Sequence, residues 1–408
     1  MAGLSLESFA AATRQISPKQ RRAAGIAAVT HALHDGYTDL IYIMLPLWQA
    51  EFGLDYAALG LLRGVFVGAM ASLQIPSGLL SEKLGAALVL ALGTALAGLG
   101  YCLAGMSAGF TTLLIALFVG GLGASTQHPI ASALVARAFA GPRSLTALGT
   151  YNFAGDIGKM TVPATLSLML LVMAWRPALA VLGCLGLVLA AVIFVVTPRY
   201  ERGGGAAKGA AESARDAPRP RFAFPLLLMI GIIDSATRMG FLLFLPFVLT
   251  QKGASLPTVG LALTLVFAGG AAGKLACAFI GARIGAIGTV WLTEGLTAAG
   301  ILALMPLPLG AALLLLPLIG IALNGTSSVL YGSVPSLVAA DWRTRALSIF
   351  YTGTIGSGAI APTLYGAVGD AFGVFKALTL VAVMVLLTLP LAALLRPALP
   401  RGYGSGAA

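Results

Sequence analysis

Apolar stretches of about 20 residues recur along this chain, and they restrict its fold more than any other feature. As an α-helix rising about 1.5 Å per residue, such a stretch crosses the roughly 30 Å core of a bilayer. With 58% hydrophobic and 10% charged residues and a mean hydropathy of +0.95, the composition excludes a soluble globular protein. Twelve stretches are expected to span, at residues 24–48, 57–80, 87–106, 111–136, 145–172, 177–197, 222–249, 257–280, 288–306, 309–338, 346–369 and 374–396.

The sequence therefore predicts an all-α integral membrane protein in two six-helix bundles. The expected parts are a cytoplasmic tail at 1–22, a first bundle at 23–197, a linker at 198–221, a second bundle at 222–396 and a cytoplasmic tail at 397–408. The linker is basic and contains the run Gly203-Gly204-Gly205, so it is expected to be flexible.

A direct repeat with an offset of about 200 residues relates the two bundles. Leu45-Pro46 recurs as Leu245-Pro246, Gly60-Leu61 as Gly260-Leu261 and Gly85-Ala86 as Gly285-Ala286. The single residue Gly120 recurs as Gly320. Six spans per half is an even number, so both halves enter the membrane with the same orientation. The repeat is then parallel, and a substrate is expected between the halves near the bilayer midplane.

The distribution of basic residues sets the expected orientation. Of the 25 Lys and Arg residues, four lie inside spans, and only Arg176, Lys252 and Lys376 fall on one side, which leaves 18 on the other. This positive-inside pattern predicts a multi-pass inner-membrane protein with both termini cytoplasmic, surrounded by lipid and without a nucleic-acid partner. We expect a monomer and no cofactor, and the isolated Cys102, Cys184 and Cys277 show no metal or disulfide spacing.

The segment Thr30–Trp48 is apolar enough to span the membrane, yet it carries His31, His34, Asp35 and Asp39. An ionised side chain at the bilayer centre costs about 2.5–3.5 kcal/mol even on the lenient insertion scale. These groups are therefore expected to face a wet or protein-lined interior.

The segment Gly78-Leu79-Leu80-Ser81-Glu82-Lys83-Leu84-Gly85, between the second and third spans, resembles the cytoplasmic loop motif of the major facilitator superfamily, with Glu82 at the usual aspartate position. The chain also resembles this superfamily in its twelve spans, its parallel repeat and its basic central linker. We expect Gly78, Glu82, Lys83 and Gly85 to act as a conformational latch, because charges at a helix end can pair with a neighbouring helix in one state only.

Shorter motifs resemble the fosmidomycin-resistance exporters of that superfamily. They are Thr30-His31-Ala32-Leu33-His34-Asp35, Gln127-His128-Pro129, and Gly155-Asp156-Ile157-Gly158 ahead of Pro163. The resemblance implies a proton-driven exporter of small toxic molecules, that is, an efflux antiporter conferring drug resistance.

Five intramembrane residues are candidates for proton coupling: Asp35, His31, His34, Asp39 and His128. Imidazole titrates between about pH 5 and 8, and a neighbouring carboxylate adjusts its affinity for protons. His31 and His128 lie at a similar depth and are expected to meet across the first and fourth spans. Two alternatives stay open, namely structural histidines bonded to backbone carbonyls and a transition-metal site formed with Asp35.

Candidate substrate-binding residues line other spans: Asp156, Lys159, Asp234, Arg238, Arg63, Asn324 and Tyr331. Asp156 with Lys159 and Asp234 with Arg238 are spaced to neutralise each other on one helix face, which is the alternative to lining a pathway. Arg63 and Lys274 lie near helix ends, where the alternative is snorkelling to headgroups. Glu294 is expected to be a packing residue, and the Gly60, Gly64 and Gly68 stripe a helix-packing surface.

These observations favour a secondary active transporter that exports a small polar or anionic molecule with proton coupling, by alternating access. Import of an organic anion or a transition-metal ion is the first alternative, and a non-transporting membrane sensor is another. We expect no enzyme, because the chain offers no nucleophile–base constellation or nucleotide-binding loop.

Overall fold

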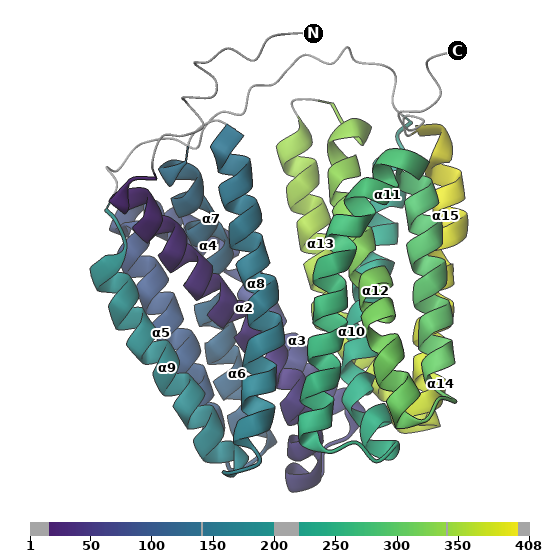
Figure 1. The fold of residues 1–408 in the computed structure, drawn as a ribbon, viewed down its shortest axis with the longest axis horizontal. Coiled ribbons are helices and arrows are strands. Elements are labelled where there is room, and N and C mark those ends of the chain that lie inside the picture. The colour runs from purple at the N-terminus through teal and green to yellow at the C-terminus, as the bar shows by residue number, and fades with distance from the viewer. Residues whose placement is uncertain (1–15, 140–141, 200–219, 340–341, 399–408) are drawn as a thin grey trace.

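The structure, a computed structural model, describes residues 16–139, 142–199, 220–339 and 342–398, and every element in these ranges is a helix (Figure 1). The first half contains α2 (Pro18–Phe52), α3 (Tyr56–Ser72), α4 (Gln74–Leu84), α5 (Ala86–Gly105), α6 (Phe110–Ala124), α7 (Gln127–Ala138), α8 (Pro142–Met169) and α9 (Trp175–Val196). The second half contains α10 (Ala223–Gln251), α11 (Leu256–Leu304), α12 (Leu309–Leu337), α13 (Arg343–Phe372), α14 (Val374–Leu386), α15 (Thr388–Leu395) and the short 3₁₀-helix η2 (Arg396–Ala398).

The helices form two groups that stand side by side, α2–α9 and α10–α15 (Figure 1). Helix α2 begins and α15 ends at the same end of the molecule, which we call the terminal face; the other end is the opposite face. Most of the predicted linker, at 200–219, and most of the two predicted tails lie outside the described residues.

The described helices account for the twelve predicted segments, although helix ends and segment ends differ. Three predicted spans are each built from two helices, α3 with α4, α6 with α7, and α14 with α15. Conversely, the residues of α11 cover two predicted spans. The two parts of α11 are separated at Gly285 (φ 75°, ψ 171°), where the backbone is not helical. By length and composition alone, eight of the described segments can cross a membrane, or nine when the bent α3–α4 pair is included. The long helices α2 and α8, which carry intramembrane charges, are not among them.

The backbone repeats where the sequence repeats. Gly53 and Gly253 have φ values of 63° and 85°, and Gly85 and Gly285 have values of 94° and 75°. Residues that have a side chain rarely adopt such positive φ angles, so glycine is the residue that ends or redirects a helix at these places. Both halves therefore turn with the same residue type at the same register.

Glycines bring the two halves into close contact where α3 meets α13. A Cβ atom on Gly60 would lie 2.4 Å from the backbone of Pro362, and one on Gly64 would lie 2.2 Å from the Ala359 oxygen. The packing role predicted for this stripe is confirmed at these two positions. Gly68 has more room, since its Cβ would meet a side-chain atom at 3.9 Å.

A carboxylate also joins the halves at the opposite face. Asp370, near the end of α13, accepts hydrogen bonds from the backbone N–H groups of Tyr56, at 2.7 Å, and Ala57, at 2.9 Å. These are unpaired donors of the first turn of α3, where the helix dipole favours an anion. The contact holds the second half against the first at that face.

Candidate functional site

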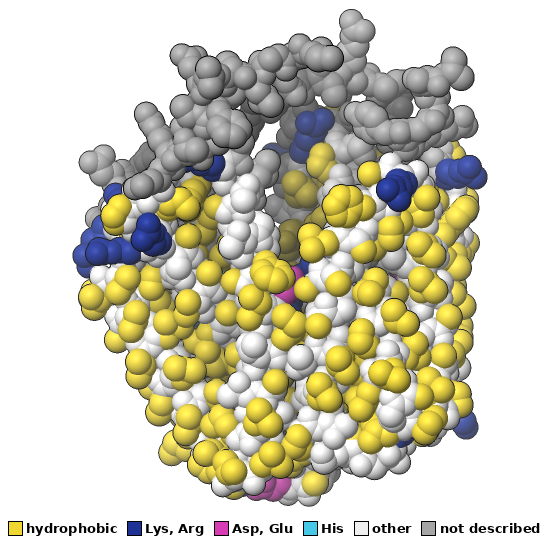
Figure 2. Space-filling model, in the orientation of Figure 1, with side chains coloured by type: hydrophobic (Ala, Val, Ile, Leu, Met, Phe, Trp, Pro, Cys, Tyr) yellow, Lys and Arg dark blue, Asp and Glu magenta, His cyan; other side chains and the backbone are white. Residues whose placement is uncertain are grey.

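The surface is hollowed between the two halves toward the terminal face, and acidic and basic side chains are visible inside (Figure 2). We call this feature the central hollow. The polar clusters around Asp35, Asp156 and Asp234 are formed by side chains of α2, α7 and α8 of the first half and of α10, α11 and α12 of the second.

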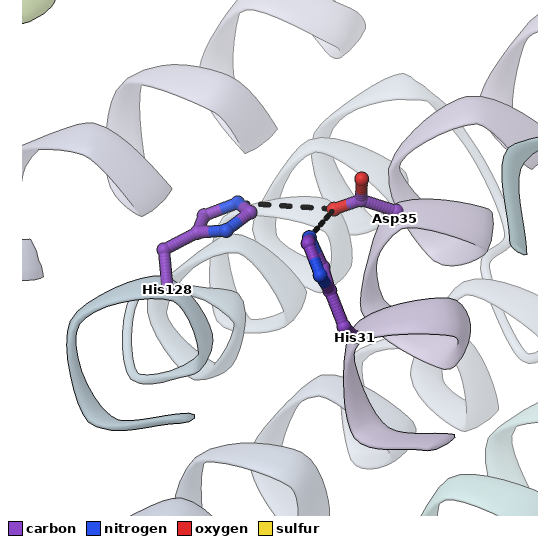
Figure 3. Close-up of side chains that lie close together, drawn as sticks. All are labelled: His31, Asp35 and His128. Carbon is purple, nitrogen blue, oxygen red and sulfur yellow. Dashed lines mark ion pairs between the residues drawn. The ribbon is translucent and has the colours of Figure 1, made fainter. Parts of the chain in front are cut away.

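Asp35, on α2, is the centre of the polar cluster in the first half. Its Oδ1 lies 3.4 Å from His31 Nε2 and 3.8 Å from His128 Nε2, and its Oδ2 lies 3.4 Å from Lys159 Nζ. Figure 3 shows both imidazole rings directed at the same carboxylate oxygen. The predicted meeting of His31 and His128 is confirmed, with ring centroids 5.2 Å apart.

The hydrogen bonds of His31 fix where its protons lie. Its Nδ1 is 2.8 Å from the backbone oxygen of Tyr151. A carbonyl oxygen only accepts, so Nδ1 carries a hydrogen and donates it. In the neutral ring Nε2 would then present a lone pair to the Asp35 carboxylate, which is repulsive. A further proton, on His31 or on Asp35, makes this contact attractive.

A glycine on α8 makes room for this pair. A Cβ atom at Gly155 would lie 2.7 Å from His31 Nε2 and 2.8 Å from Asp35 Oδ2. Only a residue without a side chain lets α8 approach α2 so closely here. Within the sequence motif, Gly155 itself thus contributes space rather than a ligand.

Two other candidates for proton coupling, His34 and Asp39, form their hydrogen bond or ion pair with groups other than Asp35. The Thr94 hydroxyl donates to the Leu90 oxygen at 2.8 Å, so it accepts from His34 Nε2 at 3.0 Å. His34 Nδ1 has no hydrogen-bond partner among the described residues. This places His34 in the helix packing between α2 and α5.

Asp39 pairs with Arg63, whose Nη2 lies 3.5 Å from its Oδ1, and the Arg63 guanidinium also lies 5.0 Å from the centroid of the Tyr42 ring. The side chains of Asp39 and Arg63 are only 7% and 2% exposed, so the structure buries this pair between α2 and α3 of the first half. Snorkelling of Arg63 to the headgroups, an alternative left open by its sequence position, is not what this structure contains.

Asp156 pairs across the two halves. Its Oδ1 accepts a 2.5 Å hydrogen bond from the Lys274 ammonium on α11, while Lys159, the partner suggested by sequence spacing, reaches Asp35 instead. The alternative in which Asp156 and Lys159 neutralise each other is therefore not what the structure contains. The i,i+3 spacing allowed that pair, but tertiary packing supplied each group with a nearer partner on another helix.

In the second half the predicted i,i+4 pair is present. Arg238 donates to Asp234 at 2.7 Å and to the Ser327 hydroxyl at 3.2 Å, and its Nε donates to the Leu323 oxygen at 3.3 Å. Asn324, on α12, donates to the Gly320 oxygen at 3.2 Å.

Tyr331 lies one turn beyond the Arg238 partners on α12, with its hydroxyl 3.0 Å from the Thr354 hydroxyl on α13. The predicted substrate residues of the second half thus lie on neighbouring helices, with Arg238 as their cation.

Exposure separates the cations that a ligand can reach from those that it cannot. The side chains of Lys274, Lys159 and Arg238 are 41%, 30% and 19% exposed, against 2% for Arg63. His128 is 40% exposed, whereas His31 is 5% exposed. Three cations and one imidazole therefore have side-chain surface that the described residues leave uncovered.

The predicted latch residues lie in the C-terminal part of α4 and at its C-cap. Gly85 ends the helix with φ 94°, and the Ser81 hydroxyl donates to the Gly78 oxygen at 2.7 Å. Glu82 and Lys83 are exposed, and neither forms an ion pair within the described part of the chain. A latch function for this segment stays a prediction.

Sequence reasoning underrated two groups. For Lys274 both snorkelling and a site role were left open, and spacing along one helix could not indicate its pairing with Asp156, which lies on α8. The backbone oxygen of Tyr151 left no signal in the sequence, since any residue offers one.

The sequence model described as Major Facilitator Superfamily matches residues 27–233 of this chain. A probable L-galactonate transporter of Escherichia coli K12 is 31% identical over 142 residues, which is 35% of this chain and 31% of that protein. The fosmidomycin resistance protein of the same organism is 30% identical over 139 residues, 34% of each chain. The match thus spans about a third of the length of these two relatives.

A longer match joins this chain to the probable sulfoacetate transporter SauU of Cupriavidus necator, with 26% identity over 357 residues, 80% of this chain and 82% of that one. Among solved structures, a bacterial homolog of the human lysosomal transporter Spinster has a TM-score of 0.77 at 15% identity, covering 96% of this chain and all of that one. A mutant of the nucleoside transporter NupG has a TM-score of 0.73 at 14% identity, covering 93% of this chain and all of that one. The predicted fold class is confirmed.

Proposed function

The chain belongs to the major facilitator superfamily and is a membrane transporter rather than an enzyme, and from that premise we propose that it carries a small organic anion coupled to protons. The observation that carries the proposal is the set of three accessible cations, Lys159, Lys274 and Arg238, each paired with one carboxylate. In a low-dielectric hollow a cation released from its carboxylate attracts an anion strongly.

The names of the relatives support an anionic substrate. Galactonate is a carboxylate, and sulfoacetate bears both a carboxylate and a sulfonate. Lysine and arginine side chains are the groups that recognise such oxyanions through charge-assisted hydrogen bonds.

The proton enters the proposal through His31 and Asp35. Their contact is attractive only with a proton between the Nε2 and carboxylate atoms, since Nδ1 already donates to the Tyr151 oxygen. His128, 40% exposed and 3.8 Å from the same carboxylate, is placed to pass that proton to and from water.

Lys159 links the proton to the anion. A proton on Asp35 removes the charge that holds the Lys159 ammonium, 3.4 Å away, and so frees that ammonium for substrate. Binding of an anion to Lys159 must in turn favour protonation of Asp35, because thermodynamic coupling is reciprocal. Proton and anion then move together as the two halves rock about the site.

A transition-metal cargo is the second candidate, since one ligand atom from each of His31, Asp35 and His128 lies within 4.8 Å of the others. The Lys159 ammonium, 3.4 Å from the same carboxylate, opposes a divalent cation there. We therefore favour a proton at this site. Metal binding to the purified protein, measured by titration calorimetry, would reverse that preference.

The positive-inside rule supports a cytoplasmic terminal face, because 18 of the 25 Lys and Arg residues fall on the predicted side of the two termini. The inner membrane as location, a monomeric state and export as the direction of transport stay predictions. Uptake and efflux assays distinguish the directions.

The test uses purified protein in sealed liposomes with an imposed pH gradient. Carboxylates, sulfonates and phosphonates should be transported, while neutral sugars and organic cations should not. Lys159→Gln, Lys274→Gln and Arg238→Gln should each weaken anion binding about 10- to 100-fold, the range expected on losing a charged hydrogen bond. Asp35→Asn should abolish accumulation driven by the gradient yet permit exchange of substrate.

The matched control is Asp55→Asn, because Asp55 caps α3 at the opposite face and asparagine caps a helix equally well. Transport restricted to cations, or accumulation that survives Asp35→Asn, contradicts the proposal.

A further inference from the structure

Glu294 is a buried acid that the proposed function does not use. It lies in the part of α11 that follows Gly285, is 1% exposed, and its Oε1 has no hydrogen-bond partner among the described residues. Its carboxyl interacts with the Asp234 carboxyl, the Thr326 hydroxyl and the Arg238 guanidinium.

The Thr293 and Thr326 hydroxyls have no hydrogen to spare for Glu294. The Thr293 hydroxyl donates to the Thr289 oxygen at 2.8 Å, and the Thr326 hydroxyl donates to Thr293 Oγ1 at 2.6 Å. A hydroxyl has one hydrogen, so Thr326 presents only lone pairs to Glu294. Asp234, as a carboxylate, also only accepts. A protonated Glu294 supplies the hydrogen that these acceptors lack.

Charge counting leads to the same result. Arg238 donates to Asp234 at 2.7 Å and is the one guanidinium near both acids in the described chain. Two ionised carboxylates beside one guanidinium would leave an uncompensated negative charge buried inside the membrane, which is strongly unfavourable. One proton on the acid pair makes the three groups neutral together.

We propose that Asp234 and Glu294 share one proton and form a second proton-binding site, in the C-terminal bundle, distinct from His31 and Asp35. The proposal extends the proposed function and rests on it in one respect, the binding of substrate by Arg238. An anion that draws Arg238 away from Asp234 leaves the pair with an unbalanced charge and favours uptake of a second proton. Each half then couples an anion-binding cation to a protonatable acid.

The test is infrared spectroscopy of the full-length protein in lipid at neutral pH without substrate, where a protonated carboxylic acid gives a carbonyl band separate from that of carboxylates. Glu294→Gln should remove the absorbance of one protonated carboxyl. Asp234→Asn should remove the same amount, because Arg238 is then free to neutralise an ionised Glu294. The double variant should lose no more than either single variant. Glu82→Gln, a change at an exposed glutamate, should leave the band unchanged.

Retention of the band in Glu294→Gln would show that Glu294 is ionised and would overturn the proposal. Retention in Asp234→Asn would show that the proton is not shared, which overturns it equally. The two single variants give the same answer independently, so misfolding of one leaves the other decisive. Because the readout needs no substrate, a failure of anion transport would contradict the proposed function without changing this result.

Discussion

At the scale of single residues, the proposed proton site depends on atoms that carry no charge. The Tyr151 oxygen assigns the His31 tautomer, and Gly155 leaves the space in which His31 and Asp35 meet. Both lie on α8, although the groups that they position lie on α2. A small displacement of α8 would therefore alter the affinity of the pair for a proton.

We predict that Gly155→Ala lowers proton-driven transport at least about tenfold, because the new Cβ would lie within 3 Å of both His31 Nε2 and Asp35 Oδ2. The measurement is the initial rate of accumulation in liposomes under a fixed pH gradient. Gly149→Ala is the matched control, since Gly149 lies on the same helix with nothing within 4 Å of its Cβ position. Equal rates in the two variants would contradict the role given to Gly155.

At the scale of helices, the contact between α3 and α13 depends on small residues at every fourth position. Without a hydrophobic driving force between helices in lipid, close backbone packing supplies much of their association. Gly60 and Gly64 allow this approach because the atoms opposite them belong to the α13 backbone, which cannot rotate away.

Gly64→Ala should lower the melting temperature of the purified protein, with a loss of stability of about 1–3 kcal/mol, the usual effect of overpacking. Its Cβ would lie 2.2 Å from the Ala359 oxygen, whereas that of Gly68 would lie 3.9 Å from the nearest atom. Gly68→Ala on the same face should therefore melt at or above the wild-type temperature, since alanine favours a helix more than glycine does. A thermal scan of both variants in lipid nanodiscs decides between them, and equal melting would refute the packing argument.

At the scale of the whole molecule, the two halves touch at the opposite face and are separated by the central hollow toward the terminal face (Figure 2). Asp370 is one of the contacts that hold the opposite face closed, through the first turn of α3. Alternating access requires such contacts to break when the hollow opens to the other side.

Asp370→Asn should increase the population of molecules that are open at the opposite face, because it removes an anion from the N-terminus of α3 and replaces one acceptor oxygen by a donor. Pulsed electron paramagnetic resonance between spin labels at Ala50 and Ser255, in a variant lacking the three native cysteines, should report a larger share of long distances. Asp55→Asn is again the control, since it retains the cap of α3. Identical distance distributions would exclude a closing role for Asp370.

The membrane-embedded all-α class, the parallel repeat and the helices that carry charge could all be predicted from the amino-acid sequence alone. Hydrophobic length and positive-inside charge are properties of local segments, and a lipid environment allows them few structures. The repeat was equally evident, because the sequence has glycine at both 85 and 285, and the backbone has a positive φ at both positions. Apolar spacing also indicated that His31 and His128 share a depth, since depth follows from residue number along a helix.

Which charged side chains pair, and which stay exposed, depends on the tertiary structure. Spacing along one helix favoured Asp156 with Lys159, but helices from different parts of the chain supplied Lys274 and Asp35 as nearer partners. Spacing also could not separate Arg63, sealed against Asp39, from the accessible Lys159. Pairing depends on distances of a few ångströms between helices, and those are set by packing contacts such as Gly155 against His31, which no single helix encodes.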